Sequence, residues 1–304
     1  MSSSNTSTTQ HVRAVGGATW IFQTTSSTSP HSLQIACDPV LCPKNHSQDY
    51  GLFKSTRLQD PVLSGDQDLE QVDVWLLTHG HEDHLDQLGL EKIVRGKNNS
   101  IIVAHPSVEK LLKNVLNQTN METVFGNDRK VYWMEPQQDL IIEDLEHFSV
   151  KIHSVNAIHA KSKKVGAAIG NGNGYIVQVK EKNSDARLSK FYVTGDSVFT
   201  ECNIQEDLQA LTSDTFDFII TNGGEASVEK TKLIGGLAKF LVGNITNSSH
   251  EIIELHRKLM PKKTLIVHHG TFSHYVETYT ADSFKEHSGI HVVFPGETKC
   301  QLVV

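Results

Sequence analysis

The feature that most constrains this chain is a string of potential metal ligands directly after an apolar strand. The run 72–77 reads as a buried strand and continues as Thr-His-Gly-His-Glu-Asp-His. An extended backbone directs His79 and His81 to one side, and imidazole is a common zinc ligand. Asp83 and His84 fall at the start of the next helix, where their side chains can face a second point next to the one that His79 and His81 face. The spacing therefore predicts two adjacent metal ions better than a single ion.

Short apolar segments bounded by Gly, Pro, Asn or Asp predict many strands. They are residues 18–22, 33–36, 72–77, 101–104, 141–152, 175–179, 191–193, 216–220, 265–267 and 291–294. Three further segments have the apolar spacing of helices, namely 84–94, 106–116 and 249–259. This mixture indicates an α/β layered protein. Strong turn signals between neighbouring strands exclude a simple alternating parallel sheet.

Composition restricts the partners and the compartment. With 28 Lys and Arg against 35 Asp and Glu, the net charge is −7, and no basic cluster suited to a nucleic acid is present. No apolar run approaches the roughly 20 residues that span a bilayer, so stable membrane association is not expected. The polar residues 1–10 predict a disordered tail without a secretion signal, followed by one domain over residues 11–304. We therefore expect a cytoplasmic protein.

Cysteine and histidine usage agree with this expectation. Cys37, Cys42, Cys202 and Cys300 include no Cys-x-x-Cys pair and are too sparse for a disulfide framework. Histidine is the one residue type in excess, with 17 copies. Because histidine is the commonest metal ligand, the excess directs attention to the string at 79–84 and to histidines after later strands.

The string His79-x-His81-x-Asp83-His84 resembles the signature of the metallo-β-lactamase superfamily. This resemblance implies a four-layer αββα sandwich with a binuclear metal site at one edge. It also implies three further ligands downstream, each after a strand: a His, a bridging Asp and a last His. Asp196, in the segment Val-Thr-Gly-Asp-Ser, matches the bridging position.

The two downstream histidines each have an alternative. His159 resembles the strand-end histidine of the family, whereas His153 alternates with Val150 and Ile152 and reads as a strand residue. For the last ligand, the segment that begins Val-His-His-Gly-Thr-Phe is similar to one in the N-acylphosphatidylethanolamine phospholipase D group. That similarity selects His268 over His269. The resemblance then places His79, His81 and His159 on one ion, Asp83, His84 and His268 on the other, and Asp196 between them.

The resemblance to the ascorbate-6-phosphate lactonase and phospholipase D branch extends to other turns. Residues 16–20, 38–40 and 222–226 look like turns of this branch, although Glu225 departs from its usual small-residue pattern. His274 matches a histidine that faces the substrate pocket in the lactonase group. The resemblance therefore makes His274 and Asp83 candidate catalytic residues. Asp38 and Asp86 are candidates to orient ligand histidines, or else ordinary turn and helix-cap carboxylates.

The expected function is that of a metal-dependent hydrolase. A hydroxide between two Zn²⁺ ions, with Mn²⁺ or Fe²⁺ as alternatives, would attack a small, anionic phosphodiester, phosphate ester or lactone. The alternative is a metal-stabilised binding or scaffold protein without turnover, whose usual mark is a lost ligand. The expected partner is a small-molecule substrate. The resemblance to the lactonase group, whose members assemble into oligomers, is also compatible with a homo-oligomer.

Overall fold

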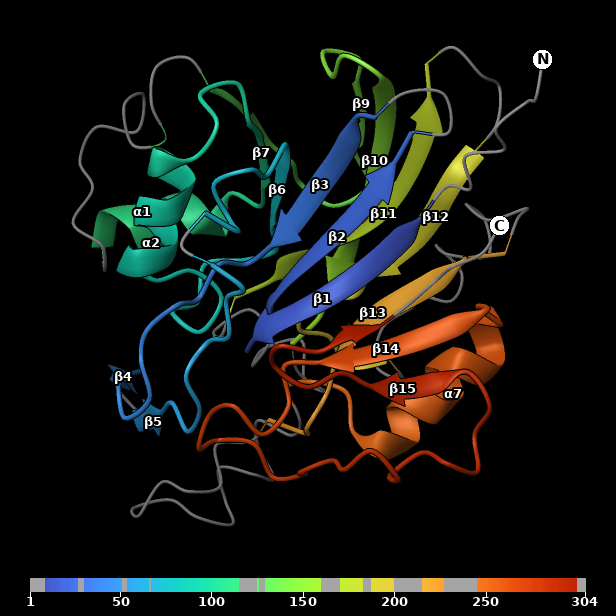
Figure 1. Ribbon diagram of the computed structural model, residues 1–304. Helices are drawn as coiled ribbons and strands as arrows, with labels where there is room; N and C mark the ends of the chain where they lie inside the picture. The colour runs from blue at the N-terminus through green and yellow to red at the C-terminus, as the bar shows by residue number, and fades with distance from the viewer. Residues whose placement is uncertain are drawn as a thin grey trace.

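The computed structural model describes residues 9–26, 30–50, 54–65, 67–114, 125, 129–159, 170–182, 187–199, 215–226 and 245–299. These residues form two seven-stranded sheets and one small two-stranded sheet (Figure 1). The first sheet has the order β16-β1-β2-β3-β6-β7-β8, and the second has the order β15-β14-β13-β12-β11-β10-β9. Both sheets mix antiparallel and parallel neighbours, as the turn signals in the sequence predict.

The strands of the first sheet are β1 (Gln10–Gly16), β2 (Thr19–Thr25), β3 (Ser32–Cys37), β6 (Val74–Leu77), β7 (Ile101–Ala104), β8 (Lys130–Trp133) and β16 (Thr298–Lys299). Those of the second are β9 (Asp139–Ile142), β10 (Phe148–Ala157), β11 (Gly172–Glu181), β12 (Arg187–Val193), β13 (Phe218–Asn222), β14 (Lys263–Val267) and β15 (Ile290–Val292). The small sheet is a hairpin of β4 (Ser47–Asp49) and β5 (Lys54–Thr56).

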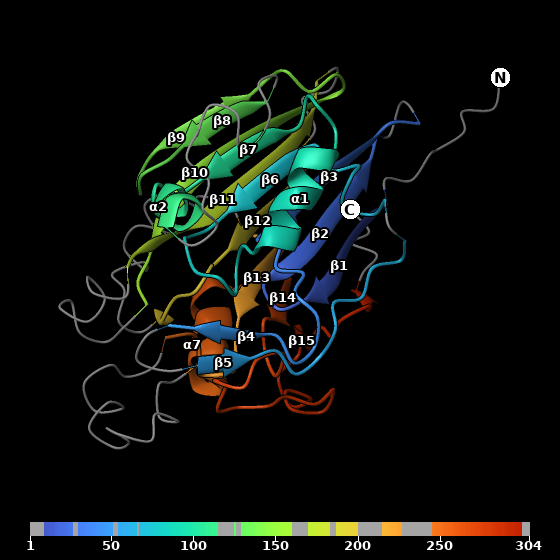
Figure 2. The same ribbon diagram turned by 90° about the vertical axis from the view of Figure 1, so that its left-hand side faces the viewer.

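Side-chain alternation along the strands builds the layers. In β6, Val74 and Leu76 pack in the core between the sheets, whereas Trp75 and Leu77 pack toward the helices. Helices α1 (Gln87–Arg95) and α2 (Ser107–Asn114) cover the outer face of the first sheet, and α7 (Ser249–Leu259) covers that of the second (Figures 1 and 2). The order helix, sheet, sheet, helix confirms the predicted αββα class.

The helix starts follow capping chemistry. Asp86 is the N-cap of α1, and its carboxylate accepts a hydrogen bond from the backbone N–H of Gly89. The helix predicted at 84–94 therefore starts three residues later. Ser248 and Glu251 form a capping box at the start of α7, whose bounds agree with the sequence prediction. The predicted helix at 106–116 corresponds to α2, and its last two residues lie outside the described part of the chain.

Two predicted boundaries are wrong. The segment 141–152 is not one strand, because its polar residues 143–147 form the turn between the antiparallel strands β9 and β10. Gln10, assigned to the tail, is buried and begins β1, where its side chain donates to the carbonyl of Leu188. Strands β1, β4, β5, β8 and β16 were not predicted, since they are short or carry polar residues.

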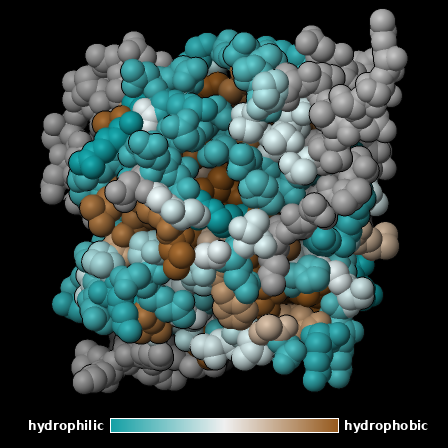
Figure 3. All heavy atoms as spheres, in the orientation of Figure 1, coloured by the Kyte–Doolittle hydropathy of each residue, from teal (hydrophilic) through white to brown (hydrophobic). Residues whose placement is uncertain are grey.

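On the face seen in Figure 3, hydrophilic side chains cover most of the surface, and hydrophobic ones reach it in separate patches. Within the described residues, no helix is both long enough and apolar enough to cross a membrane.

Candidate metal centre

The predicted ligands gather at one edge of the sandwich, where several strands end. His79 follows β6, His159 follows β10, Asp196 follows β12 and His268 follows β14. Strands β12, β13 and β14 are parallel neighbours in the second sheet, so their carboxyl ends meet at the same edge. Ligand sites of open α/β sheets form at such an edge. The topology therefore brings together residues that are far apart in the sequence.

The first group consists of His79, His81 and His159. Each offers one ring nitrogen, and the three nitrogens lie within 4.8 Å of one another. Nε2 of His79 lies 2.8 Å from Nδ1 of His81, and the rings of His79 and His159 are 4.4 Å apart. Because a zinc–nitrogen bond is about 2 Å long, ligands of one ion lie within roughly 4 Å of each other. This group has the dimensions of a metal site.

A glycine between His79 and His81 lets the loop lie against α2. A Cβ atom at Gly80 would come within 2.2 Å of the carbonyl oxygen of Ser107, and the Gly80 N–H donates to the Ser107 hydroxyl. Since a larger residue would push the loop away from α2, glycine at this position fixes the direction of both flanking imidazoles.

The tautomer of His79 follows from its neighbours. The Thr78 hydroxyl donates its proton to Asp38 at 2.6 Å, so it can only accept from Nδ1 of His79, 2.9 Å away. Burial, followed by the nearby His84 and His81, lowers the pKa of His79 well below its ordinary value. The imidazole is therefore neutral, and its Nε2 lone pair is available to a cation.

The second group consists of Asp83, His84 and His268, and their ligand atoms also lie within 4.8 Å of one another. Nε2 of His268 lies 3.1 Å from Nε2 of His84 and 3.7 Å from Oδ2 of Asp83. On its other side, His84 donates from Nδ1 to Asp38 at 2.7 Å. This bond fixes the His84 ring so that Nε2 faces the centre, as a carboxylate does for a metal-bound histidine.

Asp196 lies between the two groups. Its carboxylate is within 4.8 Å of one nitrogen of His79 and one of His84, a residue from each group. Asn222 at the end of β13 donates to Oδ1 of Asp196 at 2.7 Å, which orients the carboxylate. Although burial would raise the pKa of Asp196, the charge and hydrogen bond of His84 lower it. A carboxylate at this position can contact both groups.

Charge distribution within the second group favours cation binding. Burial lowers the pKa of His84, but the carboxylates of Asp196 and Asp38 outweigh it and raise the pKa above the ordinary value. A cation bound to Nε2 of His84 would release that proton, as metal binding generally does. His268 behaves differently: burial and the neighbouring His84 lower its pKa to about 3, so it offers a neutral imidazole.

The backbone separates His268 from His269. His268 has a φ of 57°, a left-handed conformation that costs a non-glycine residue about 1–3 kcal/mol. The strained turn directs His268 to the centre, where its Nδ1 is buried without a hydrogen bond. His269 instead packs its ring against Tyr279 and Phe294, with Nε2 3.4 Å from the carbonyl of Val293.

The structure also separates His159 from His153. His153 lies within β10 and pairs with Asp139 at 3.2 Å, away from the clustered histidines. His159 is fully buried, and neither of its ring nitrogens has a hydrogen-bond partner. Burial and the neighbouring His81 lower its pKa to about 3. Two unpaired nitrogens on a buried imidazole are costly unless one of them binds a ligand.

Asp38 and Asp86 have different roles. Asp38, at the end of β3, accepts hydrogen bonds from the Thr78 N–H, the Thr78 hydroxyl and His84, so it orients a residue of the centre. Asp86 caps α1 with one oxygen and accepts from the N–H groups of Leu41 and Cys42 with the other. It makes no hydrogen bond to a histidine in the described part of the chain.

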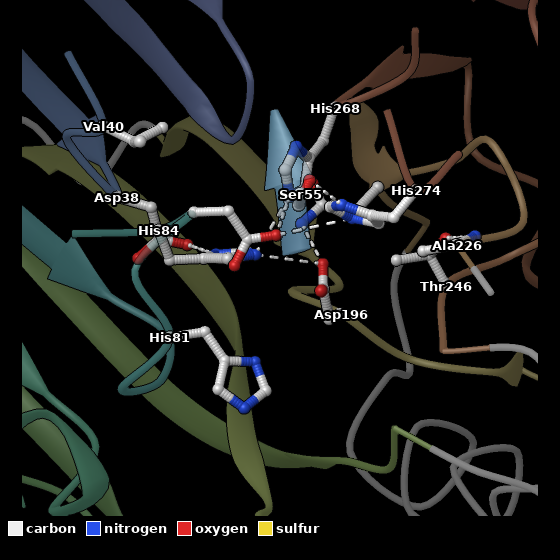
Figure 4. A network of polar contacts seen from close by, with 12 residues as sticks. Asp38, Val40, Ser55, His81, His84, Asp196, Ala226, Thr246, His268 and His274 are labelled. Atoms are coloured by element: carbon white, nitrogen blue, oxygen red, sulfur yellow. Dashed lines mark hydrogen bonds and ion pairs between the residues drawn. The ribbon is translucent and has the colours of Figure 1, made fainter. Parts of the chain in front are cut away.

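Asp83 and His274 are adjacent and buried at the centre. Nε2 of His274 lies 3.6 Å from Oδ2 of Asp83, and its Nδ1 lies 2.5 Å from the hydroxyl of Ser55 on β5 (Figure 4). Burial would raise the pKa of Asp83, but the imidazoles of His84, His274 and His268 lower it. Asp83 is therefore an ionised carboxylate beside a neutral histidine, whose pKa burial lowers.

The hairpin β4–β5 contributes residues that the sequence did not indicate. Ser55 contacts His274, and the hydroxyl of Tyr50 donates to Gln48, whose amide donates to the carbonyl of Glu82. Tyr275, next to His274, packs its ring against His268 with centroids 5.2 Å apart. Only proximity to His274 in the sequence hinted at Tyr275. Nothing in the sequence links the hairpin to the centre, because that contact depends on tertiary packing.

A second cluster lies at the opposite end of the sandwich. His31, Glu146 and His147 line a cavity of about 480 Å³ there, beside the starts of β3 and β10. The two imidazoles are stacked 3.8 Å apart at 21°, so their in-plane lone pairs run side by side instead of converging. His31 and Glu146 are exposed. The edge with His79 and Asp196 is therefore the stronger candidate.

Residues 34–269 match the model of a family described as the beta-lactamase superfamily domain. Among curated proteins, none matches the sequence significantly.

Solved structures show the same fold at low sequence identity. An isothiocyanate hydrolase from Delia radicum gut bacteria is 17% identical with a TM-score of 0.67, over 96% of this chain and 99% of that one. A possible metal-dependent hydrolase from Veillonella parvula is 17% identical with a TM-score of 0.64, over 96% and 98%. A diiron β-hydroxylase from Streptomyces venezuelae is 12% identical with a TM-score of 0.56, over 96% of this chain and 54% of the other.

Proposed function

The chain belongs to the beta-lactamase superfamily domain family, and from this we propose that it is a metal-dependent hydrolase with a two-metal centre. One observation carries the proposal: two groups of three ligands lie side by side, and the carboxylate of Asp196 is within reach of both. Two structural neighbours, described as an isothiocyanate hydrolase and as a possible metal-dependent hydrolase, support this activity. The family prediction made from the string at 79–84 is confirmed at the level of the superfamily.

The residues fit two cations in number and kind. Five imidazoles and two carboxylates supply seven ligands, which suit zinc and also accept manganese or iron. Both ring nitrogens of His159 are buried and have no hydrogen-bond partner in the described part of the chain. Coordination through one of them would satisfy this ring in part. We propose that His79, His81 and His159 hold one ion, Asp83, His84 and His268 the other, and Asp196 both.

The cations, when bound, would supply Lewis-acid polarisation of the scissile bond and activation of water at neutral pH. The chain's own residues do the rest. Asp38 and Thr78 hold His84 and His79 in the ligand tautomer. The ionised carboxylate of Asp83 is placed to accept, at Oδ2, the proton of the attacking water. His274 contacts Ser55 through Nδ1, and its Nε2 lies beside Oδ2 of Asp83. We propose that this ring lines the substrate pocket.

The proposed substrate is a small anionic molecule. The chain carries a net charge of −7, yet two divalent cations would make the centre itself locally positive. Such a site favours an anionic phosphodiester, phosphate ester or lactone. The sequence resemblance to the lactonase and phospholipase D branch supports the same classes. The isothiocyanate hydrolase neighbour adds a further substrate class to be tested.

The first test combines metal analysis with a substrate screen. We expect the purified wild-type protein, expressed with added zinc, to carry about two equivalents of metal. The screen comprises an aryl phosphodiester, a phosphomonoester, a set of lactones, a thioester and an aryl isothiocyanate. The His81→Ala variant is expected to lose one ion and the activity. A chain without metal, or equal turnover in the variant, contradicts the proposal; metal without turnover supports a scaffold.

A second test distinguishes His159, which the sequence favours as the ligand, from the alternative His153. The His159→Ala variant is expected to weaken metal binding by more than about 100-fold, since loss of a ligand exceeds the effect of a residue that only orients one. The matched control is His153→Ala, which removes an imidazole from the same strand region and leaves metal binding unchanged. Titration of the metal-depleted proteins with Co²⁺, followed by visible absorption, measures both. A larger effect in His153→Ala would exchange the two assignments.

A further inference from the structure

The hydroxyl of Tyr275 is buried without a partner. Tyr275 is 5% exposed, and its hydroxyl has no hydrogen-bond partner among the residues that the structure describes. A buried hydroxyl that gives up water without a replacement bond destabilises the folded state. Proteins retain such groups mainly where a ligand or ordered water completes the hydrogen bond.

Tyr275 belongs to the wall of the candidate centre. Its ring centroid lies 5.2 Å from that of His268 and 4.5 Å from that of His274. Burial raises the pKa of the Tyr275 hydroxyl, and the carboxylates of Asp196 and Asp83 raise it further. The ring of Tyr275 thus packs between His268, a candidate ligand, and His274, which lies beside Asp83.

The ring of Tyr275 is held in place by the glycine turn after β13. A Cβ atom at Gly224, where φ is +97°, would come within 2.7 Å of Cδ1 of Tyr275. The backbone of Tyr275 also forms an antiparallel bridge with Ala226. A ring confined in this way cannot swing its hydroxyl toward solvent. The turn 222–226, noted in the sequence, thus makes room for this tyrosine.

Tyr279 provides an internal comparison four residues later. It is also buried, and it packs against Gly223 of the same turn. Its hydroxyl accepts from the N–H of Gly224 and donates to Glu277, so both hydrogen-bonding functions are used within the fold. The contrast between the two tyrosines indicates that Tyr275 keeps its hydroxyl for a partner outside the chain.

We infer that the hydroxyl of Tyr275 donates a hydrogen bond to an oxygen atom of an anionic substrate bound at the centre. The inference rests on the proposed function and specifies the substrate as an oxyanion. The carboxylates of Asp83 and Asp196 only accept hydrogen bonds, and Nδ1 of His274 is engaged with Ser55. Tyr275 adds a hydroxyl donor that these carboxylates cannot supply, and it would orient the substrate oxygen.

The test compares Tyr275→Phe with Tyr279→Phe in the zinc-loaded full chain, with inorganic phosphate as the probe. Calorimetric titration measures phosphate affinity, elemental analysis measures zinc, and thermal unfolding measures Tm. We expect Tyr275→Phe to keep its zinc and its Tm while phosphate affinity falls about 10-fold or more, as for a lost hydrogen bond to a charged group. Tyr279→Phe is expected to lower Tm and leave phosphate affinity unchanged.

The possible results distinguish a failure of the proposed function from a failure of the role of Tyr275. A wild-type chain that binds no zinc overturns the proposed function, and the role of Tyr275 falls with it. Zinc-loaded protein that binds no phosphate, or binds it equally well after Tyr275→Phe, overturns the role of Tyr275 alone. A lower Tm in Tyr275→Phe also overturns it, because it would show that the hydroxyl has a partner within the fold, such as a structural water.

Discussion

Replacing Asp196 by Asn is expected to reduce bound metal from about two equivalents to one or fewer and to lower kcat/KM by about 10³-fold. The carboxylate lies within reach of both ligand groups and is oriented by Asn222. An amide of the same shape keeps the packing but loses the negative charge that offsets repulsion between two cations. Metal chemistry contributes several kcal/mol to such reactions, and about 4 kcal/mol corresponds to that factor.

The matched control is Asp217→Asn. Asp217 is a buried aspartate of the same sheet, at the other end of the strands, where it accepts from the Lys190 N–H and pairs with Lys262. Its loss is expected to lower stability and leave the metal content unchanged. Elemental analysis and steady-state kinetics measure both variants. An Asp196→Asn protein that retains two ions at wild-type affinity would show that this carboxylate is not shared.

Replacing Asp38 by Ala is expected to lower the free energy of unfolding by about 3–5 kcal/mol, the usual effect of removing one partner of a buried ion pair. Asp38 is 1% exposed and accepts hydrogen bonds from His84, the Thr78 N–H and the Thr78 hydroxyl. All three donors would be left unpaired. Since His84 would also lose its orientation, metal affinity should fall by about 10–100-fold.

The control for Asp38 is Asp73→Ala at the opposite end of the same sheet. Asp73 accepts from the N–H of Gln34 and from Lys97, but its side chain is partly exposed. Its removal is expected to cost about 1 kcal/mol and to leave metal affinity unaltered. Denaturant unfolding and Co²⁺ titration distinguish the two variants. Equal losses of metal affinity in both would mean that Asp38 acts through general stability and not through His84.

The fold could be predicted from the sequence because the apolar pattern of the strands and the ligand string are local signals. A continuous apolar run, as in β6, identifies a strand buried on both faces, and the string that follows identifies the family. The same reasoning failed where local signals compete. The turn at 143–147 lies between two apolar segments that were joined into one strand, and β8 is an edge strand without a buried residue.

The residues of the candidate centre also differ in how clearly the sequence indicated them. His79, His81, Asp83 and His84 are close in sequence, so the chain itself keeps them close in space. Asp196 was identified by its turn after a strand. Strand alternation favoured His159 over His153, and the resemblance to the phospholipase D group favoured His268 over His269. Both alternatives stayed open, because each pair lies near the same strand end. Ser55 and Tyr50 gave no signal at all.

The sequence by itself therefore determined which types of metal ligand the chain offers and how they are spaced locally, because these ligands lie in one short segment, residues 79–84. Only the tertiary structure decided which distant residues complete the centre. The register of the second sheet leaves His153 within β10 and brings His159 to the edge, and the left-handed turn at His268 directs that ring inward while His269 packs outward. The same packing places Tyr275 beside His268 with an unpaired hydroxyl. Such contacts depend on how strands align across the fold, which no local pattern encodes.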